Sequence, residues 1–370
     1  MILILTQCFP SRLGGVESLV SNLALSLSKS EKIIVFADRH HIFYDAIFDN
    51  QHKDEILVRR VGGIKFFRRR KKIKEIKPFI QSRQVSLVIA DSWKSLELGI
   101  DFLNINKIPV ICLAHGNELL SKNKRKTNRI QKTLNKVTSV VSNSVFTKNL
   151  VQNIISTKVP VNVVLPGASD LRNISEFEIP NIKGYPIILT LSRLEKRKGH
   201  SFIIESVKKI LPKLPRLQYI IAGDGPEKNF LMNLVKKNNL EATVKFIGTV
   251  NDQQKKYLFQ KTDLMIMPTL DESENRSIEG FGIAYLEAAF FGIPSIASNV
   301  GGAPEAVLDK KTGIIINNIN ELYDAMNNLL NDNGYLKKLG EQAKIRAINE
   351  FDWSEVSKKY LISDIIKQSK

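Results

Sequence analysis

The chain has 370 residues, of which 43% are hydrophobic and 25% charged, a composition typical of a soluble globular protein with room for two domains. No apolar run approaches the roughly 18 residues that a membrane-spanning helix needs, so a transmembrane protein is not expected. The short apolar start at residues 1–6 lacks the basic flank of a secretion signal. The two cysteines, Cys8 and Cys112, lie in or beside apolar segments without zinc-ligand spacing, which indicates buried thiols in a reducing compartment.

The net charge of +18 is concentrated in the first half of the chain. Residues 1–166 carry 27 Lys and Arg against 12 Asp and Glu, whereas residues 167–370 carry 28 against 25. This asymmetry indicates an anionic partner for the first half. In the densest basic run, residues 65–74, apolar side chains stand between the basic ones, which is typical of a membrane-attaching segment. We expect its patch to be Arg68, Arg69, Arg70, Lys71 and Lys72; the alternative is a solvated face of a lysine-rich chain.

Along the chain, apolar runs of strand length alternate with helical patterns. Residues 16–28 show the helical pattern most clearly, because their apolar side chains recur with the 3.6-residue period. The first series of expected strands is Ile2–Leu5, Ile33–Phe36, Leu87–Ala90, Val110–Leu113, Ser139–Val141 and Val161–Val164. The second series is Ile187–Leu191, Tyr219–Ala222, Val244–Phe246, Leu264–Met267, Ser295–Ala297 and Gly313–Ile316.

Two successive series of this kind predict two doubly wound α/β domains, with ligands at the carboxyl ends of the strands. The polar stretch 166–184 is expected to contain the boundary. We therefore divide the chain into residues 1–166 and 167–352.

The most informative segment lies in the second half and contains two glutamates eight residues apart. Glu279 precedes the run Gly280-Phe281-Gly282, which suits a tight turn, and an apolar helical face follows up to Glu287. A helix entrance offers free backbone N–H groups and a positive dipole end, so it favours phosphate. A carboxylate beside such a site can accept two hydrogen bonds from a sugar diol.

This segment, together with Gly292-Ile293-Pro294 and Gly301-Gly302-Ala303-Pro304-Glu305, resembles the signature of retaining GT-B glycosyltransferases of the large "glycosyl transferases group 1" family, family 4. Further motifs of that family are matched in order along nearly the whole chain. They are Gly14-Gly15-Val16-Glu17, Ala114-His115-Gly116, residues 191–199, Ala222-Gly223-Asp224-Gly225-Pro226, Phe246-Ile247-Gly248 and the helix start at Trp353.

The resemblance implies two Rossmann-like doubly wound domains that face a central cleft. Residues 1–166 would bind the acceptor, residues 167–352 the nucleotide sugar, and the helix 353–370 would return to the first domain. The implied catalytic residues are His115, which lines the sugar, Glu279, which holds its hydroxyls, and Arg193 and Lys198, which neutralise the leaving diphosphate. The implied donor-binding residues are Gly14, Gly15, Gly223, Gly225, Ile247, Gly248, Phe281, Gly282, Ile283 and Glu287.

The function expected from these residues is metal-independent, retaining transfer of a hexose-type sugar from a UDP- or GDP-linked donor, without a further cofactor. The acceptor would be a hydroxyl of a lipid or lipid-linked glycan in cell-surface polysaccharide or glycolipid synthesis, at the cytoplasmic face of an anionic membrane. Two alternatives stay open. A nucleotide-sugar epimerase shares the GT-B fold, and a non-catalytic binder of membrane or nucleic acid would explain the basic half. Recognised nucleic-acid motifs are absent from the sequence, so no specific nucleic acid is expected.

Overall fold

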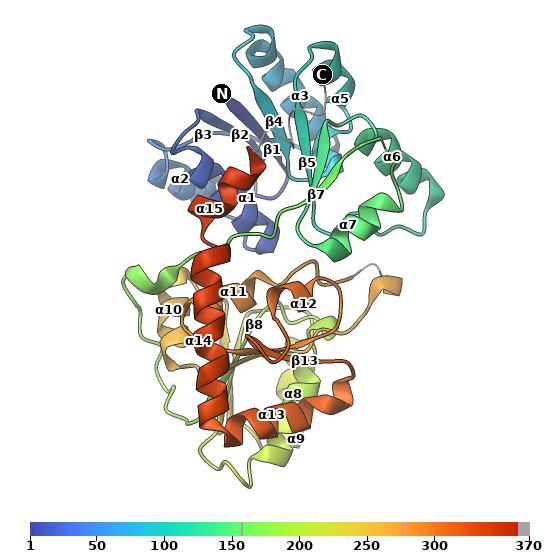
Figure 1. Ribbon diagram of the computed structural model, residues 1–370. Coiled ribbons are helices and arrows are strands. Elements are labelled where there is room, and N and C mark those ends of the chain that lie inside the picture. The colour runs from blue at the N-terminus through green and yellow to red at the C-terminus, as the bar shows by residue number, and fades with distance from the viewer. Residues whose placement is uncertain (157, 276, 362–370) are drawn as a thin grey trace. The chain divides into compact units, whose positions relative to one another are not determined.

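The computed structural model describes residues 1–361 apart from residues 157 and 276, and the chain divides into two compact units (Figure 1). The first unit contains residues 1–167 and the segment from Trp353 onward, and the second contains residues 168–352. The part of the predicted last helix at 362–370 lies outside the described residues. No helix in the described part is both long and apolar enough to cross a membrane.

The first unit is built on a seven-stranded sheet in the order β3-β2-β1-β4-β5-β6-β7, with every neighbouring pair parallel. The order reverses between β1 and β4, which is where ligands bind in doubly wound sheets. The strands are β1 (Ile2–Thr6), β2 (Ile33–Asp38), β3 (Leu57–Val61), β4 (Leu87–Ala90), β5 (Val110–Ala114), β6 (Ser139–Ser142) and β7 (Val161–Val163).

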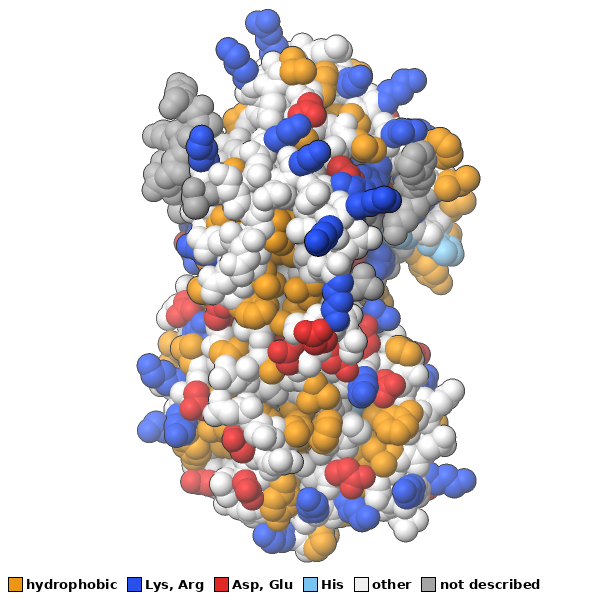
Figure 2. Space-filling model, turned by 90° about the vertical axis from the view of Figure 1, so that its right-hand side faces the viewer, with side chains coloured by type: hydrophobic (Ala, Val, Ile, Leu, Met, Phe, Trp, Pro, Cys, Tyr) orange, Lys and Arg blue, Asp and Glu red, His pale blue; other side chains and the backbone are white. Residues whose placement is uncertain are grey.

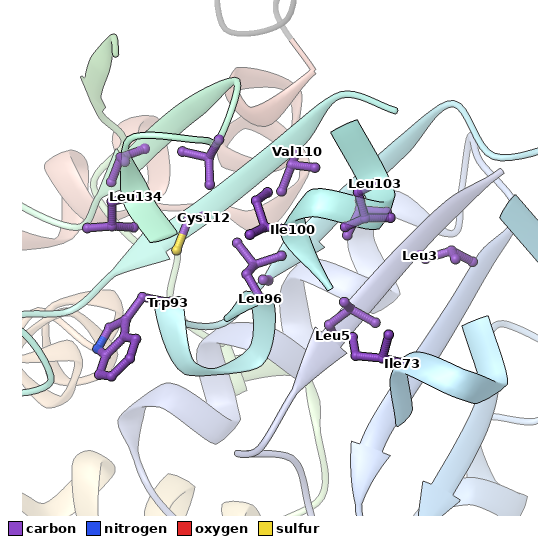
Figure 3. Packing of buried hydrophobic residues seen from close by; sticks show 14 of the residues in the cluster. Leu3, Leu5, Ile73, Trp93, Leu96, Ile100, Leu103, Val110, Cys112 and Leu134 are labelled. Atoms are coloured by element: carbon purple, nitrogen blue, oxygen red, sulfur yellow. The ribbon is translucent and has the colours of Figure 1, made fainter. Parts of the chain in front are cut away.

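The helices of the first unit cover both faces of this sheet (Figure 1). Figure 3 shows Leu3 and Leu5 of β1 packed near Ile73, and Cys112 of β5 near Trp93 and Leu96, within one buried cluster. The helices are α1 (Gly15–Leu27), α2 (Ile42–Gln51), α3 (Lys65–Gln81), α4 (Trp93–Leu96), α5 (Ile100–Ile105), α6 (Lys124–Leu134), α7 (Val145–Gln152) and α15 (Trp353–Tyr360).

The sequence did not predict the edge strand β3. Its residues, Leu-Val-Arg-Arg-Val, are exposed or half-buried except for Val61. An edge strand is paired on one side only and needs no continuous apolar run, so its sequence resembles a loop. The neighbouring strand β2, buried along its whole length, supplies the pairing that makes this segment a strand.

The second unit repeats the same topology with six parallel strands in the order β10-β9-β8-β11-β12-β13. The strands are β8 (Ile187–Leu191), β9 (Gln218–Ala222), β10 (Val244–Gly248), β11 (Leu264–Met267), β12 (Ser295–Ser298) and β13 (Gly313–Ile316). The helices are α8 (His200–Ile210), α9 (Lys228–Lys237), α10 (Asp252–Lys261), α11 (Ile283–Phe290), α12 (Ala303–Ala306), α13 (Leu322–Asn331) and α14 (Asn333–Glu350). Four 3₁₀ turns complete the described elements. They are η1 (Leu171–Asn173) before β8, η2 (Lys196–Lys198) after β8, η3 (Ser273–Asn275) after β11 and η4 (Ile319–Glu321) after β13.

Helix α15 packs against α1 within the first unit, although 325 residues separate the end of one from the start of the other in the chain. Ser26 of α1 donates its hydroxyl hydrogen bond to the carbonyl of Trp353 at 2.9 Å and lies 2.9 Å from the hydroxyl of Ser357. The Trp353 ring covers Gly167, where a Cβ atom would overlap the indole. These contacts explain why the chain after residue 352 belongs to the first unit.

Helices α11 and α14 pack closely because a glycine in α14 faces another glycine. A Cβ atom at Gly340 would overlap the carbonyl oxygen of Gly292, which follows α11 in a left-handed conformation with φ of 76°. Gly334, in the first turn of α14, has only the end of the Asp332 side chain near it, at 3.5 Å. A methyl group would therefore clash with backbone at Gly340 but find room at Gly334.

We expect Gly340→Ala to destabilise the second unit by about 1–3 kcal/mol, because the added methyl group forces the α11–α14 contact apart. The control is Gly334→Ala, which should leave stability unchanged or slightly raised, because alanine restricts the unfolded chain. Urea unfolding followed by circular dichroism measures both. Equal midpoints for the two variants would contradict the close contact.

A buried histidine lies behind the loop that follows β8. His200 begins α8, and its Nε2 lies 3.3 Å from the hydroxyl of Ser192 while its Nδ1 lies 3.4 Å from that of Tyr219. Burial, with a smaller contribution from Lys198, lowers the pKa of His200 to about 4. The folded protein therefore keeps this imidazole neutral at pH values where an unfolded chain protonates it.

The unfolding free energy should consequently fall as the pH is lowered from about 6.5 toward 4, because only the unfolded state gains the His200 proton. In His200→Gln this part of the slope should disappear. Urea titrations at several pH values give the unfolding free energy as a function of pH. Identical slopes for wild type and His200→Gln would contradict the assigned contribution of His200.

Candidate active site

The loop after β8 and the segment before α11 meet in a buried ion-pair cluster. Glu279 Oε2 accepts hydrogen bonds from the Lys198 ammonium and, at 3.0 Å, from the Arg197 guanidinium. Lys198 and Glu279 are both buried. Lys198 also contacts the sulfur of Met267, at the end of β11. The cluster therefore lies where the strand order of the second unit reverses, between β8 and β11.

The cluster carries more positive than negative charge. Burial alone would raise the pKa of Glu279, but Lys198 and Arg197 outweigh it and hold that pKa below its ordinary value. Glu195 bridges two arginines, Arg193 at 2.9 Å and Arg197 at 3.2 Å. Three cations and two carboxylates leave one net positive charge, which favours an anionic ligand.

Backbone contacts fix this loop against its neighbours. Gly199 has a φ of 72°, and a Cβ there would overlap the carbonyl of Pro268, just after β11. The N–H of Leu270 donates to the carbonyl of Arg197 at 2.7 Å. On the other side, Gly302 N–H donates to the carbonyl of Glu279 at 2.9 Å. The charged side chains are thus held by main-chain contacts from three loops, which preorganises them for a ligand.

Helix α11 begins beside Glu279 with donors that have no partner. Gly282 caps it with a φ of 99°, a conformation that glycine adopts without strain. Throughout the described part of the chain, no acceptor faces the backbone N–H groups of Phe281, Gly282 and Ile283. Free N–H groups at the positive end of a helix dipole bind phosphate. The predicted anion site therefore has both parts, helix-end donors and cationic side chains.

The second predicted glutamate, Glu287, is buried in the same helix and already has a partner. Its Oε1 lies 3.0 Å from the Lys255 ammonium, which also lies 3.0 Å from Asp252. Burial would lower the pKa of Lys255, but the charges of Glu287 and Asp252 outweigh it and raise that pKa. This ion pair orients the carboxylate of Glu287, and Lys255 is a residue that sequence reasoning did not identify.

Gly223 and Gly225 pack against the backbone of the basic loop. A Cβ at Gly223 would overlap the carbonyl of Ser192, and one at Gly225 would lie 2.5 Å from the carbonyl of Leu194. The N–H of Gly223 also donates to the carbonyl of Gly248 at 2.7 Å, whereas a Cβ atom at Gly248 would point into open space. Gly223 and Gly225 thus hold the loops after β8, β9 and β10 together. Ile247, which precedes Gly248, is half-buried.

In the first unit, Gly14 and Gly15 lie where β1 leads into α1. Gly15 is the first residue of α1, and a Cβ at Gly14 would overlap the carboxylate of Glu17. That carboxylate is paired with Arg12 at 2.9 Å. Gly14 thus leaves room for the Glu17 carboxylate at the entrance of a 13-residue helix, the element expected to face a phosphate.

His115 follows β5 in the same unit and is held in one orientation. Its Nε2 lies 2.9 Å from the carbonyl of Asp91, and its backbone N–H donates to Glu118 at 2.7 Å. A carbonyl can only accept, so Nε2 carries the proton and Nδ1 of the neutral ring is left as an acceptor. Asp91 was not identified from the sequence; its carboxylate accepts from the hydroxyl of Thr6 at 2.9 Å and ties β4 to β1.

The predicted basic patch is corrected by the structure. Lys72 is buried and paired with Asp38 at 2.8 Å, so it cannot contact a membrane. Arg68 is half-buried and faces Asp38 at 3.4 Å, and Arg69 is paired with Glu97. The physical reason is helical geometry, because one side of α3 must face the unit and its basic residues there find acids. Arg70 and Lys71 remain exposed.

The predicted diphosphate pair also needs an addition. Arg193 lies at the mouth of the cluster with 68% of its side chain exposed, whereas Arg197 contacts Glu279 directly. Sequence spacing alone did not distinguish the two arginines of one short loop. Within the described residues, no three His, Cys, Asp or Glu side chains are grouped to hold a metal ion.

Part of the second unit matches a known protein family, and relatives match nearly the whole chain. Residues 172–346 match the family described as "Glycosyl transferases group 1". A GDP-mannose-dependent alpha-(1-6)-phosphatidylinositol monomannoside mannosyltransferase of Mycolicibacterium smegmatis is 23% identical, over 95% of both chains. A GDP-mannose-dependent monoacylated alpha-(1-6)-phosphatidylinositol monomannoside mannosyltransferase of Corynebacterium glutamicum is 24% identical, over 95% of this chain and 94% of its own.

Solved structures share the fold at lower identity. The Anabaena protein HepE in complex with UDP-glucose superposes with a TM-score of 0.77 at 20% identity, covering 97% of this chain and 98% of its own. Sucrose-phosphate synthase from Thermosynechococcus elongatus superposes with a TM-score of 0.79 at 18% identity over 100% of both chains. We conclude that the chain has the GT-B fold and that residues 172–346 of its second unit are similar to the glycosyl transferases group 1 family.

Proposed function

We propose that this protein is a retaining, metal-independent glycosyltransferase that moves a hexose-type sugar from a UDP- or GDP-linked donor to a lipid or lipid-linked acceptor. The observation that carries the proposal is the Glu279 cluster. A buried carboxylate is held by Lys198 and Arg197 directly beside free helix-end N–H groups. Such a site offers cations and N–H donors to a diphosphate and a carboxylate to the hydroxyls of the attached sugar.

In this proposal the diphosphate lies between the basic loop and the start of α11. Arg193, Arg197 and Lys198 neutralise the charge that develops when the bond from the sugar carbon to the diphosphate oxygen breaks. The acceptor oxygen bonds to the same face of that carbon, and its proton passes to the departing phosphate oxygen. No protein nucleophile is required, and the Lys255 pair presents Glu287 to the ribose.

We also propose roles for two groups of the first unit, taken by itself. The N–H groups at the start of α1, at Gly15, would bind phosphate, and Nδ1 of His115 would accept a hydrogen bond from a sugar hydroxyl. The tautomer set by the Asp91 carbonyl supports this role, because it leaves an acceptor on the free side of the ring.

Two relatives are named for transfer to phosphatidylinositol mannosides, which supports a lipid acceptor. As part of the same proposal, we place the reaction at the cytoplasmic face of a membrane, in glycolipid or cell-surface polysaccharide synthesis. The donor base stays open between uracil and guanine, since those relatives are named for GDP-mannose and HepE was solved with UDP-glucose.

Thermal-shift measurements with UDP, GDP, ADP and their common sugar conjugates test the donor site. One nucleotide should stabilise the protein, by about 2.7 kcal/mol at a hundred times its dissociation constant. EDTA should not change the shift, because helix-end donors and cations take the place of a metal ion. Arg193→Ala and Arg197→Ala should each reduce it.

The matched control for these two variants is Arg216→Ala, an exposed arginine just before β9 and hence at the opposite edge of the sheet. If Arg216→Ala abolishes the nucleotide-induced thermal shift as well, the nucleotide does not bind specifically at the basic loop after β8. No shift with any nucleotide would favour a non-catalytic binder, and an interconverted sugar without acceptor would identify an epimerase.

Glu279→Gln separates binding of the nucleotide from transfer of the sugar. Glutamine keeps the shape but removes a negative charge beside the diphosphate, so binding of the bare nucleoside diphosphate should be retained or strengthened. Transfer should fall by about 100-fold, because a neutral amide cannot stabilise the reacting sugar as a carboxylate does.

Initial rates with radiolabelled donor give the measurement, and Glu241→Gln, an exposed residue before β10, is the control. Glu279→Gln with unchanged transfer would show that this carboxylate does not contact the donor sugar.

A further inference from the structure

We propose that the loops after β1, β2 and β3 form a surface, here named the loop face, that inserts apolar side chains into an anionic lipid bilayer. The inference rests on the lipid acceptor of the proposed function and goes beyond it, because it adds exposed apolar side chains to the basic start of α3 as the docking element. The loop face consists of residues 7–14, 39–44 and 62–71, of which the last two segments include the first residues of α2 and α3.

Large apolar side chains point into solvent from all three segments of the loop face. They are between 57% and 78% exposed: Leu13, Ile42, Phe43, Tyr44, Ile64 and Phe67. Single exposed apolar residues are normal in a soluble protein, but a group of this size marks an interaction site. In Figure 2 hydrophobic side chains stand out from the edge of the first unit, next to histidine.

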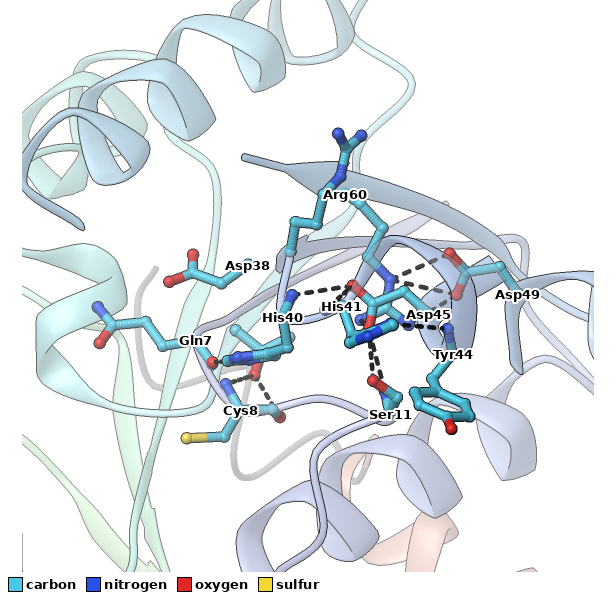
Figure 4. A network of polar contacts seen from close by, with 12 residues as sticks. Gln7, Cys8, Ser11, Asp38, His40, His41, Tyr44, Asp45, Asp49 and Arg60 are labelled. Carbon is cyan, nitrogen blue, oxygen red and sulfur yellow. Dashed lines mark hydrogen bonds and ion pairs between the residues drawn. The ribbon is translucent and has the colours of Figure 1, made fainter. Parts of the chain in front are cut away.

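The apolar side chains stay exposed because a buried network fixes the loops below them (Figure 4). The carboxylate of Asp45 in α2 accepts from the hydroxyl of Ser11 at 2.7 Å and from the backbone N–H of His40 at 2.9 Å. In the third segment, the Arg68 guanidinium donates to the carbonyl of Arg39 at 3.2 Å. These contacts join the three segments of the loop face to one another.

The charge of the loop face complements an anionic bilayer. Its three segments contain seven Lys and Arg and no Asp or Glu. Three of these seven are paired with acids outside the segments, namely Arg12, Arg68 and Arg69, whereas Arg39, Arg70 and Lys71 are exposed. Exposed aliphatic and aromatic side chains beside exposed cations suit the boundary between lipid headgroups and acyl chains. Nucleic acid fits less well, because isoleucine and leucine offer bases no stacking surface.

The loop face also has the right place within the first unit. Its loops all follow carboxyl ends of strands, and the loop after β1 leads directly into Gly14 and the start of α1. Ligands of doubly wound units bind at this edge. A bilayer held against it would bring the headgroup hydroxyl of a lipid to the edge at which the acceptor is expected.

Flotation of the full chain with phosphatidylcholine vesicles, with or without about 30 mol% phosphatidylglycerol, tests the proposal. The protein should bind the anionic vesicles, less so as salt rises. Ile42→Ser combined with Phe43→Ser should weaken binding at least about tenfold, because two exposed side chains no longer enter the apolar layer. The matched control, Phe230→Ser with Met232→Ser, replaces two exposed side chains of α9 and should bind as wild type.

Insertion itself is read from fluorescence. Phe43→Trp should shift its emission to the blue on anionic vesicles and be quenched by brominated lipid, whereas Phe230→Trp should do neither. The proposal is overturned if wild type binds no anionic vesicles, or if the Ile42→Ser, Phe43→Ser variant binds like wild type. It is also overturned if size-exclusion chromatography shows a dimer that this variant breaks, since the loop face would then join two copies of the chain.

These vesicles carry no glycan acceptor, so binding does not depend on sugar transfer. Nucleotide thermal shifts on the same variants report the donor site separately and confirm that the variants are folded. Vesicle binding without any nucleotide shift would contradict the proposed function but not the loop face as a docking surface. A nucleotide shift without vesicle binding would contradict the loop face alone.

Discussion

The buried contact of Glu279 with Lys198 and Arg197 is the constraint on which the second unit's site depends. A carboxylate or ammonium group removed from water is several kcal/mol less stable unless it has a partner. The fold meets this requirement by placing the ends of β8 and β11 and the start of α11 around one point, and by using glycines where backbones must touch. Because two cations face a single buried carboxylate, the cluster still attracts a further anion.

The same logic appears in the first unit with a different result. There Asp38 at the end of β2, Asp45 in α2 and Asp91 just after β4 accept hydrogen bonds from neighbouring segments of the chain. Their role is to position backbone, because each already has several donors. What remains available outside this network is positive charge and apolar surface, which differs from the polar cluster of the second unit. Two units of one topology thus present different groups, a polar ion-pair cluster in the second unit and exposed cations beside apolar side chains in the first.

The charge of the first unit differs between the sequence and the folded structure. The excess of Lys and Arg in residues 1–166 is real, yet several of these cations are internal once the chain folds. Lys72 joins α3 to β2, and Arg60 joins β3 to α2. The number of Lys and Arg residues in the sequence is therefore larger than the number of cations that a partner of the first unit can contact. The exposed apolar side chains beside the remaining cations are what distinguish one surface of this unit from an ordinary basic face.

The sequence by itself determined the two βα series and the local pattern of the candidate anion site. Buried parallel strands are continuous apolar runs, and the turn Gly280-Phe281-Gly282 between two glutamates is a local pattern, so both can be recognised without coordinates. Only the tertiary structure decided which charges pair. It showed that Arg197 contacts Glu279, that Lys255 holds Glu287, that Lys72 is buried and that residues 57–61 form an edge strand. These depend on partners tens of residues away, and periodicity along the chain contains no information about distant partners.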